Sequence, residues 1–455
     1  MSSIRRIVVI GCSGTGALAA MSLKKRRPDL EVTILREPDE RGLLTRCATP
    51  YICCGNVMVE PSYKDDAMFT DQNIRLVNSR AETLDHVAKK VTTADEATYA
   101  YDTLILATGA KPILPPVEGI QLPGVFALRK SGDAVNILNW LNTKRVRTAV
   151  MLGAGPIGVE IAYLAARHGI RIHVVEMLEH ILPKALDPDM SAEVESYMQS
   201  HNVELYLRQR LERIKGNGEM EGVVLSSGEQ IETQMVLISV GVKPNTELAE
   251  QAGLKIGDHG LAVNKYLQTS DPNIYAGGDL IEYPHWVTGK PALGQLRPNA
   301  VIAGRVIASN ILGESIEYPS LINSFATKFF DKSIAGTGLT EQQAMTEGID
   351  VVSTKQSSAS MHSMMRGRRP YTVKLLFEKG SGRIIGGQIV GDSDCPVKHI
   401  DVITTAIRGK LTALDLATLR CAGQPELSPD PGREPIALAA GEAYHVLSRS
   451  IQNGQ

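Results

Sequence analysis

The stretch Gly153-Ala154-Gly155-Pro156-Ile157-Gly158 is a complete GxGxxG motif. Around it lie a strand-like apolar run, an expected helix and a second apolar run, at 147–152, 159–168 and 171–175. The second run ends at Glu176. Strand, glycine turn, helix, strand and terminal acid stand in the order that a dinucleotide-binding βαβ unit requires. The motif therefore predicts an α/β fold with a dinucleotide on this turn.

The acidic residue after the second strand indicates which dinucleotide binds. A carboxylate at Glu176 would bind the hydroxyls of the adenosine ribose and repel a 2′-phosphate. Met177 and Leu178 follow it, where a site for NADPH usually offers a cation. We therefore expect NADH rather than NADPH, held by the glycines of the motif and by Glu176.

A second glycine turn lies near the start of the chain. Gly11-Cys12-Ser13-Gly14-Thr15-Gly16 follows an apolar run at 4–10 and precedes an expected helix at 17–25. Glycine lets the backbone approach a pyrophosphate, whose charge suits a helix N-terminus. A further apolar run leads to Glu37, which would accept hydrogen bonds from ribose hydroxyls. Ser13 replaces the middle glycine, so the motif taken alone also fits a purely structural turn.

Three later strand ends favour the nucleotide interpretation. They are Ala107-Thr108-Gly109, Gly241 and Gly277-Gly278-Asp279, each of which follows a short apolar run. In a chain with two nucleotide folds, a strand that ends in Gly-Gly-Asp suits a carboxylate reaching a polyol, and a solvated turn aspartate is the alternative. From about Asn323 the pattern changes to a hairpin and helices, which indicates a separate α+β domain.

Composition excludes several classes of protein. A chain of 455 residues is long for one core, so two or three domains are expected. The net charge of −2 argues against a nucleic-acid or membrane-surface binder, and no apolar run approaches the ~20 residues of a membrane span. The first apolar run stops at a glycine turn, as in a β-strand, and cytoplasmic location is the default. The six cysteines contain no CxxC pair, so no metal site is expected.

The stretch Arg46-Cys47-Ala48-Thr49-Pro50-Tyr51-Ile52-Cys53-Cys54-Gly55 concentrates three of these cysteines. Thr49-Pro50 resembles an N-cap and first helical position, so Cys47 precedes a helix start and adjoins Arg46; both features favour the thiolate. In a helix, Cys47 and Cys53 would be about 9 Å apart along the axis, beyond the ~7 Å limit of a disulfide. We therefore expect no disulfide between them. Cys53 and Cys54 fit inert packing, with a sulfur-relay thiol as the alternative.

Taken together, these motifs resemble the two-dinucleotide flavoprotein disulfide reductases over essentially the whole chain. Cys47-Ala48-Thr49-Pro50-Tyr51 is similar to the Cys-Gly-x-Pro-Tyr of the single-cysteine branch, which contains coenzyme A-disulfide reductases, NADH oxidases and NADH-dependent persulfide reductases. The resemblance implies FAD on the first glycine turn, with Asp279 near its ribityl chain or pyrophosphate. It places NADH on one face of the flavin and Cys47, as the catalytic sulfur, on the other. It also implies a homodimer in which the C-terminal domain completes the partner's site.

The resemblance implies two Rossmann-like domains followed by a C-terminal α+β dimerisation domain. Its FAD-binding domain would be discontinuous, its NAD-binding domain inserted, and its interface domain last. The corresponding ranges are 1–112 with 246–322, 113–245, and 323–455. In this arrangement Gly11, Ser13, Gly14, Gly16, Glu37, Ala107, Thr108, Gly109 and Asp279 serve FAD, and Gly241 joins the NAD site.

The chain departs from its relatives near the substrate. Gly14 stands where NADH peroxidases and many NADH oxidases have a histidine, and no His-Pro…Glu pair is present near the C-terminus. Where coenzyme A-disulfide reductases place interface tyrosines, this chain has methionines and a divergent segment at 424–431. The candidate substrate or partner-subunit residues are Met364, Met365, Arg366, Arg368, Cys421 and Gln424. The basic run fits either a solvated loop or a site for an anionic thiol, and Cys421 either packs or approaches the partner's Cys47.

The expected activity is electron transfer from NADH through FAD and Cys47 to a low-molecular-weight disulfide, persulfide or polysulfide. Cys47 would be the nucleophile that attacks the external sulfur. Two alternatives remain at this point. An NADH oxidase would reduce O2 through a sulfenate at Cys47, and an electron-transfer subunit would pass electrons to a protein partner.

Overall fold

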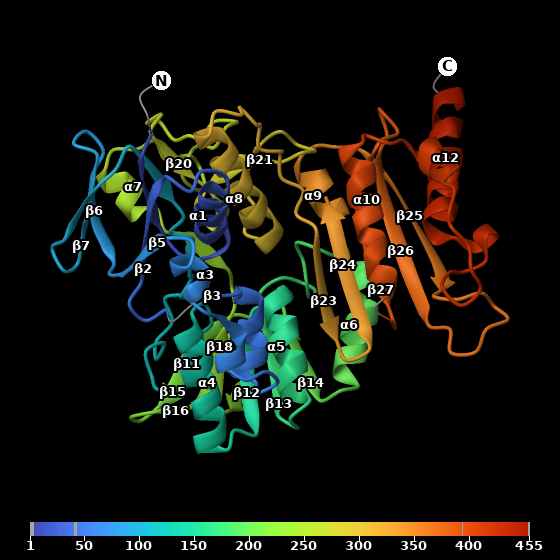
Figure 1. Ribbon diagram of the computed structural model, residues 1–455. Coiled ribbons are helices and arrows are strands. Elements are labelled where there is room, and N and C mark those ends of the chain that lie inside the picture. Colours follow the sequence, from blue (N-terminus) through green and yellow to red (C-terminus); the bar gives the residue numbers. More distant parts are fainter. Residues whose placement is uncertain (1–3, 41–42, 394, 454–455) are drawn as a thin grey trace. The chain divides into compact units, whose positions relative to one another are not determined.

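The computed structural model describes residues 4–40, 43–393 and 395–453 (Figure 1). The chain divides into two compact units, each built from three segments. The first unit comprises Met1–Ile113, Ala127–Leu141 and Gly241–Leu321. The second comprises Leu114–Phe126, Asn142–Val240 and Ile322–Gln455. The chain therefore crosses repeatedly between the units, so residues of one site come from distant segments.

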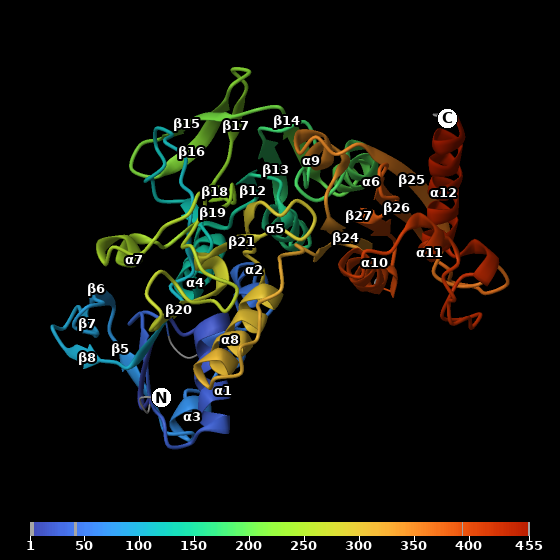
Figure 2. The ribbon, with the colours of Figure 1, turned by 90° about the horizontal axis from the view of Figure 1, so that it is seen from above.

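The first unit is organised by a five-stranded parallel sheet in the order β20-β9-β1-β2-β5. Its strands are Ile274–Ala276, Thr103–Leu106, Arg6–Ile10, Glu31–Arg36 and Ile74–Asn78. All are short, and all except the edge strand β5 are almost fully buried, as expected of a parallel sheet covered on both faces. Helices α1 (Gly14–Arg26) and α8 (Arg297–Ile311) lie side by side in both views (Figures 1 and 2).

Smaller elements complete the first unit. They are an antiparallel sheet of β6 (Ala81–Asp85), β7 (Lys90–Thr93) and β8 (Thr98–Ala100), the ribbon β10 (Ala110–Pro112) with β19 (Val242–Pro244), and the helices α2 (Thr49–Cys53), α3 (Ala67–Thr70), α7 (Glu247–Gln251) and most of α4 (Ser131–Lys144). The ribbon pairs Ala110 with Pro244 and Pro112 with Val242, so the two crossings of the chain lie together here.

The second unit contains the other predicted nucleotide fold. Its sheet has the order β11-β18-β12-β13-β14, in which β18, β12, β13 and β14 run parallel. The strands are Val125–Ala127, Met235–Ile238, Thr148–Leu152, Arg171–Glu176 and Val203–Leu207, with helices α5 (Pro156–Ala166) and α6 (Pro188–Gln199). The expected strand–turn–helix–strand order at 147–176 is confirmed. A small antiparallel sheet follows, formed by β15 (Leu211–Gly216), β16 (Met220–Leu225) and β17 (Gln230–Glu232).

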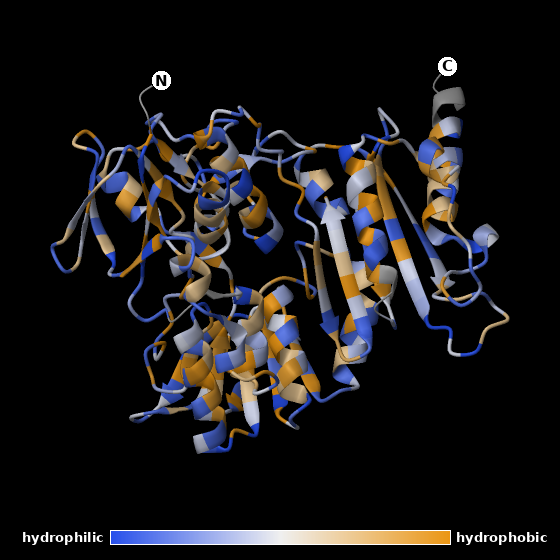
Figure 3. Cartoon of the chain, viewed as in Figure 1, coloured by the Kyte–Doolittle hydropathy of each residue, from blue (hydrophilic) through white to orange (hydrophobic). Residues whose placement is uncertain are grey.

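The second unit also holds a C-terminal antiparallel sheet in the order β23-β24-β27-β26-β25. The strands are Phe325–Phe329, Lys332–Gly338, Ile384–Gly391, Pro370–Glu378 and Val351–Ala359. The helices are α9 (Glu341–Thr346), α10 (His399–Arg408), α11 (Ala413–Ala417) and α12 (Pro435–Asn453). Hydrophobic and hydrophilic residues share α10 (Figure 3), and its buried residues are Ile400, Ile403, Ala406 and Ile407. The predicted hairpin is confirmed as β26 and β27, and the predicted α+β character of this region is confirmed as well.

Within the described part of the chain, no helix combines the length and the apolar character that crossing a bilayer requires.

Candidate active site

The first glycine turn joins β1 to α1 at the carboxyl end of the sheet. Gly11 has a φ of +106°, and a Cβ there would lie 2.2 Å from the Ala107 carbonyl oxygen. A Cβ on Gly16 would lie 2.0 Å from the Gly11 carbonyl oxygen. Gly11 therefore requires glycine because the turn packs directly on the end of β9, and Gly16 requires it because the start of α1 packs directly on the turn. The Ala107-Thr108-Gly109 motif thus packs against the glycine turn at Gly11.

The N-terminus of α1 suits a phosphate group. Ser13 is the N-cap, but its side chain makes no capping hydrogen bond, and no acidic residue lies in the first turn of the described helix. No acidic side chain of the helix therefore occupies the backbone N–H groups at this end. An anion-binding turn requires such N–H groups to be available to the ligand. A Cβ on Gly14 would lie 3.0 Å from the Ala300 Cβ, so this position is tightly packed.

Hydrogen bonds join the Ala107-Thr108-Gly109 motif to the chain that follows Gly241, beside this turn. Thr108 Oγ1 donates to the Asn245 carbonyl oxygen at 3.0 Å, and Asn245 Nδ2 donates to the Thr108 carbonyl oxygen at 2.9 Å. The backbone N–H of Asn245 also donates to the Gly109 carbonyl oxygen at 2.9 Å. Gly241, predicted for the NAD site, begins this returning segment with a φ of +119°, and it belongs to the first unit.

Asp279 has an ionic partner that the sequence did not reveal. Its Oδ2 lies 2.7 Å from Arg129 Nη2, and both side chains are largely buried. Arg129 comes from a segment about 150 residues earlier, just before α4. The backbone N–H groups of Arg129 and Lys130 both donate to Asp133 Oδ2, at 2.9 and 2.7 Å, which fixes this segment. In the sequence this ion pair was signalled only by the basic pair Arg129-Lys130, followed by Asp133 as a possible helix-capping acid.

Glu37, the predicted ribose ligand, directly follows β2 and is about half exposed. Lys130 Nζ lies 3.7 Å from its Oε2, and Arg80 Nε lies 3.8 Å from its Oε1. Lys130 also pairs with Asp39 at 3.1 Å. These exposed, mostly long contacts leave the carboxylate accessible to a polar ligand.

Cys47 is exposed and lies in a single 3₁₀ turn, Arg46–Ala48, that leads into α2. The N-cap of α2 is Ala48, so the predicted cap at Thr49 is wrong by one residue; Thr49 Oγ1 instead donates to the Arg46 carbonyl oxygen at 2.7 Å. Arg46 Nη1 pairs with the buried Glu40 at 2.8 Å. The helix that follows Cys47 is thus only five residues long, and the guanidinium of Arg46 is engaged by a carboxylate.

The neighbouring cysteines are buried. Cys53 Sγ donates to the Pro50 carbonyl oxygen at 3.1 Å and lies 3.7 Å from Cys54 Sγ. Both side chains are buried, which agrees with the packing interpretation. Burial raises the pKa of Cys12 to about 12, although the charge of Arg36 opposes the shift. The Cys12 thiol therefore stays protonated and packs beneath the turn.

The second glycine turn joins β12 to α5. Gly153 has a φ of +99°, and a Cβ there would lie 2.8 Å from the Ser239 carbonyl oxygen. A Cβ on Gly158 would lie 2.1 Å from the Gly153 carbonyl oxygen, whereas nothing described lies within 4 Å of one on Gly155. Gly155 therefore leaves open space at the N-cap of α5, whose described first turn contains no acidic residue.

Glu176 lies at the mouth of this second turn. Its Oε2 accepts from the Ala154 N–H at 2.8 Å, and its Oε1 accepts from the Leu178 N–H at 2.9 Å. The carboxylate is therefore held against the glycine turn, with lone pairs left for ribose hydroxyls. Met177 is 62% exposed, so the position expected to carry a cation for NADPH presents a thioether instead.

The two divergent C-terminal segments lie side by side in the second unit. The loop between β25 and β26 carries Met364, whose side chain is 69% exposed. His362 in the same loop donates its backbone N–H to the Pro425 carbonyl oxygen at 2.9 Å. Its Nε2 lies 3.1 Å from Asp430 Oδ2. His362, which sequence reasoning missed, therefore joins the two segments predicted to select the substrate.

The other candidate substrate residues occupy this same surface. Arg366 and Arg368 are exposed, and Arg368 Nη1 donates to the Ser363 carbonyl oxygen at 2.8 Å. Gln424 is exposed, and its Oε1 accepts from the Glu426 N–H at 2.7 Å. Cys421 is exposed, but partial burial and the charge of Glu434 raise the pKa of its thiol. Met365 is only partly exposed. Within the described residues, no group of three or more His, Cys, Asp or Glu side chains is placed to hold a metal ion.

Comparison with known proteins identifies the family. Residues 5–303 match the model of the pyridine nucleotide-disulphide oxidoreductases, and residues 324–433 match the dimerisation domain of the same proteins. The chain belongs to the pyridine nucleotide-disulphide oxidoreductase family. It is therefore an oxidoreductase, and the family implies FAD and NAD(P)H as cofactors. The matched dimerisation domain indicates a homodimer. The predicted family and fold class are confirmed.

Several members of this family resemble the chain over nearly its whole length. The NADH oxidase of Methanocaldococcus jannaschii is 33% identical over 454 residues, covering 97% of this chain and 99% of the relative. The CoA-dependent NAD(P)H sulfur oxidoreductase of Pyrococcus furiosus is 32% identical over 431 residues, covering 93% and 96%. Among solved structures, the NAD-dependent persulfide reductase from A. fulgidus superposes with a TM-score of 0.93 at 33% identity, covering 97% of this chain and 83% of that one.

Proposed function

We propose that this oxidoreductase uses NADH to reduce low-molecular-weight disulfides, persulfides or polysulfides, with Cys47 as the catalytic sulfur. The observation that carries the proposal is an exposed Cys47 in the same compact unit as the predicted FAD-binding residues. Relatives named as sulfur oxidoreductase and persulfide reductase support the substrate class. Anaerobic turnover of NADH with a persulfide or polysulfide tests it directly, and failure with every sulfur acceptor would contradict it.

The residues of the first unit fit a bound flavin dinucleotide. Gly11, Ser13 and Gly14 would receive its pyrophosphate at the N-terminus of α1, Glu37 would bind a ribose, and Asp279 would reach its polyol chain. When bound, FAD supplies two-electron transfer between a pyridine nucleotide and sulfur. We propose the boundaries 1–112 with 246–322 for this domain, 113–245 for the NAD-binding domain and 323–455 for the dimerisation domain.

The chemistry of Cys47 balances with one NADH per turnover. Cys47 Sγ, as thiolate, attacks an external sulfur, the S–S bond of the substrate breaks, and the leaving thiolate takes a proton from solvent. Cys47 is then held in a mixed disulfide with the second half of the substrate. Two electrons that originate in NADH cleave this bond and return Cys47 to thiolate. For a persulfide, RSSH + NADH + H⁺ gives RSH + H2S + NAD⁺.

The loop between β25 and β26 and the 424–431 segment, which His362 connects, would together bind the substrate of the partner subunit's site. Their exposed arginines, beside an exposed methionine, suit an anionic thiol with an apolar body. We place the enzyme in the cytoplasm, where reduced pyridine nucleotide is available and cysteines remain thiols.

We expect Arg366→Gln to raise the KM for coenzyme A disulfide roughly 5- to 50-fold, because a charge-assisted contact to phosphate would be lost. The KM for uncharged hydroxyethyl disulfide should not change. Lys379→Gln is the matched control, since Lys379 is also an exposed cation and lies just beyond the other end of β26. Steady-state kinetics with both disulfides provide the measurement. An equal effect on both substrates would contradict an anion-binding role.

We propose NADH rather than NADPH as the physiological donor, because Glu176 opposes a 2′-phosphate and Met177 offers no charge. We expect Met177→Arg to raise kcat/KM for NADPH roughly 10-fold by supplying a cation to that phosphate, with Glu176 limiting the gain. Met177→Gln, which adds polarity without charge, should leave the ratio of NADPH to NADH activity unchanged. The rate of flavin bleaching with each nucleotide measures this ratio. No gain in Met177→Arg would show that the 2′-phosphate lies elsewhere.

A second candidate function is an NADH oxidase that uses O2 as acceptor, favoured by the name of the M. jannaschii relative. Packing at Gly14, which stands where the resemblance places a histidine in many NADH oxidases, weakens it because a side chain there would meet Ala300. Vigorous O2 consumption without any anaerobic sulfur reduction would favour the oxidase.

A further inference from the structure

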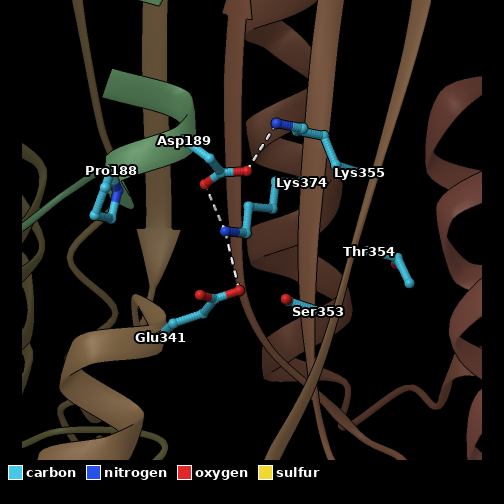
Figure 4. A pocket seen from close by; sticks show the side chains of 7 residues that line it. All are labelled: Pro188, Asp189, Glu341, Ser353, Thr354, Lys355 and Lys374. Atoms are coloured by element: carbon cyan, nitrogen blue, oxygen red, sulfur yellow. Dashed lines mark hydrogen bonds and ion pairs between the residues drawn. The ribbon is translucent and has the colours of Figure 1, made fainter. Parts of the chain in front are cut away.

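A buried lysine joins the two folds of the second unit. Lys374, on β26, is 4% exposed, and its Nζ contacts three carboxylates. The distances are 2.7 Å to Asp189 Oδ1, 3.0 Å to Glu341 Oε1 and 3.1 Å to Asp187 Oδ2. Figure 4 shows Asp189 between Lys374 and Lys355, in an open pocket of about 400 Å³. Cation and carboxylates thus form one network, which we term the Lys374 cluster: Asp187, Asp189, Glu341, Lys355 and Lys374.

Asp187 is the most buried member and is bound from several sides. It is the N-cap residue of α6 and is 1% exposed. Gln388, on β27, donates from Nε2 to Asp187 Oδ2 at 2.6 Å and accepts from the Asp187 N–H at 2.8 Å. The Glu341 N–H donates to Asp187 Oδ1 at 2.9 Å. The C-terminal sheet and α9 therefore fix the residue at which α6 begins.

The segment before Asp187 reaches back to the predicted NAD turn. Leu182, with a φ of +51°, donates its N–H to the Ala154 carbonyl oxygen at 2.9 Å. The N–H groups of Ala185 and Leu186 both return to the Leu182 carbonyl oxygen, at 2.8 and 2.9 Å. A compact turn thus spans 182–186. Continuous bonds lead from Ala154, through this turn, to Asp187 and the C-terminal sheet.

Both backbone polar groups of Ala154 therefore have a hydrogen-bond partner. Its N–H binds Glu176, and its carbonyl oxygen binds Leu182. Burial lowers the pKa of Lys374, but the surrounding carboxylates outweigh this and raise it above its usual value. The cation therefore persists at neutral pH. Its removal would leave Asp187 as a buried charge without its cation, which favours movement of that residue toward water.

We propose that the Lys374 cluster is a positioning element for the pyridine nucleotide: it holds the 182–187 segment, and through it the Ala154 turn, in the conformation that binds NADH. The dimerisation domain would thereby set nucleotide affinity within its own subunit. This inference rests on the proposed use of the 153–158 turn, but not on the identity of the sulfur substrate or on Cys47.

The chain offers a matched control for this cluster. Lys332, on β24, is also buried at 8% exposure, and it joins Glu193 of α6 to Asp392 after β27. It therefore links the same two folds with the same kind of contact. Glu193 lies further along α6 and not at the segment that contacts Ala154. Lys374→Met and Lys332→Met each remove one buried cation between α6 and the C-terminal sheet, but only Lys374→Met leaves a carboxylate as buried as Asp187 without its cation.

The test is binding of NAD⁺ and of ADP-ribose to the flavin-loaded protein, measured by calorimetry without any sulfur substrate. We expect Lys374→Met to weaken both ligands roughly 3- to 30-fold, and Lys332→Met to change them less than about 2-fold. The KM for NADH in flavin reduction should rise in parallel, with the maximal rate retained. If Lys374→Met does not fold, Glu341→Gln supplies a milder change that keeps the cation and should shift binding in the same direction.

Two outcomes would overturn the proposal. One is equal weakening by Lys374→Met and Lys332→Met, which would mean a general effect of domain packing. The other is unchanged nucleotide affinity in a Lys374 variant whose thermal stability has fallen. A wild-type protein that binds NAD⁺ but reduces no sulfur acceptor would instead contradict the proposed function, so the two failures are distinguishable.

Discussion

We expect the Cys47→Ser protein to be reduced by NADH at the wild-type rate, yet to lose disulfide and persulfide reduction by at least roughly 10³-fold. A serine hydroxyl is not appreciably ionised at neutral pH, so it cannot open an external S–S bond. Cys47 is the exposed sulfur of the 46–55 stretch, whereas Cys53 and Cys54 are buried. Anaerobic stopped-flow absorbance of the flavin, followed by steady-state thiol release, separates the two half-reactions.

Cys421→Ser is the matched control, because Cys421 is also exposed but has a raised thiol pKa. At a given neutral pH this shift leaves Cys421 with less thiolate than an ordinary cysteine has. We expect this variant to retain most of its activity. Sulfur reduction that survived in Cys47→Ser and disappeared in Cys421→Ser would move the catalytic role to the C-terminal segment. Flavin reduction lost in Cys47→Ser would indicate damage to the cofactor site instead.

The second large effect should come from Arg129. We expect Arg129→Met to weaken FAD binding roughly 10- to 100-fold, because Asp279, which we propose reaches the polyol chain of FAD, would be left as a carboxylate without its cation. The pair is largely buried, so water would only partly replace the lost contact. The flavin-to-protein absorbance ratio after gel filtration gives occupancy, and titration of apoprotein with FAD gives the dissociation constant.

Three further variants separate charge from packing at this pair. Arg129→Lys keeps the cation and should bind FAD nearly as well as the wild type. Arg129→Met combined with Asp279→Asn removes both charges and should recover part of the loss. Lys144→Met removes a cation from the far end of α4, and its FAD content should be normal. Full FAD occupancy in Arg129→Met would show that this ion pair does not serve the cofactor.

Local patterns were sufficient to predict the fold. At the turns of Gly11 and Gly153, a buried strand, a glycine with positive φ and a helix follow one another. Each of these three features produces a recognisable pattern within about 15 residues of sequence. The ribbon of β10 and β19 was foreseeable only in part. Its two strands are far apart in sequence, and the hydrogen bonds of Asn245 with Thr108 carry no periodic signal.

The candidate site was less predictable because its partners come from distant segments. Arg129 reaches Asp279 across 150 residues, and His362 joins two candidate substrate segments whose mutual contact no sequence pattern indicated. The ion pair of Arg46 with Glu40 was missed for the same reason, since no pattern in the sequence indicated it. The cap of α2 was misplaced because Thr49 has a local alternative, a hydrogen bond to the Arg46 carbonyl oxygen.

The two buried sulfurs at the end of α2, Cys53 in its last turn and Cys54 at its C-cap, can report on the opening of this short helix. Cys53 and Cys54 follow Cys47 within seven residues, and alkylating reagents reach them only when the helix opens. Under conditions where reclosing outpaces modification, their labelling rate measures the free energy of that opening. The mobility of the polypeptide that carries the reactive thiol is thus readable from its immediate neighbours, without an added probe.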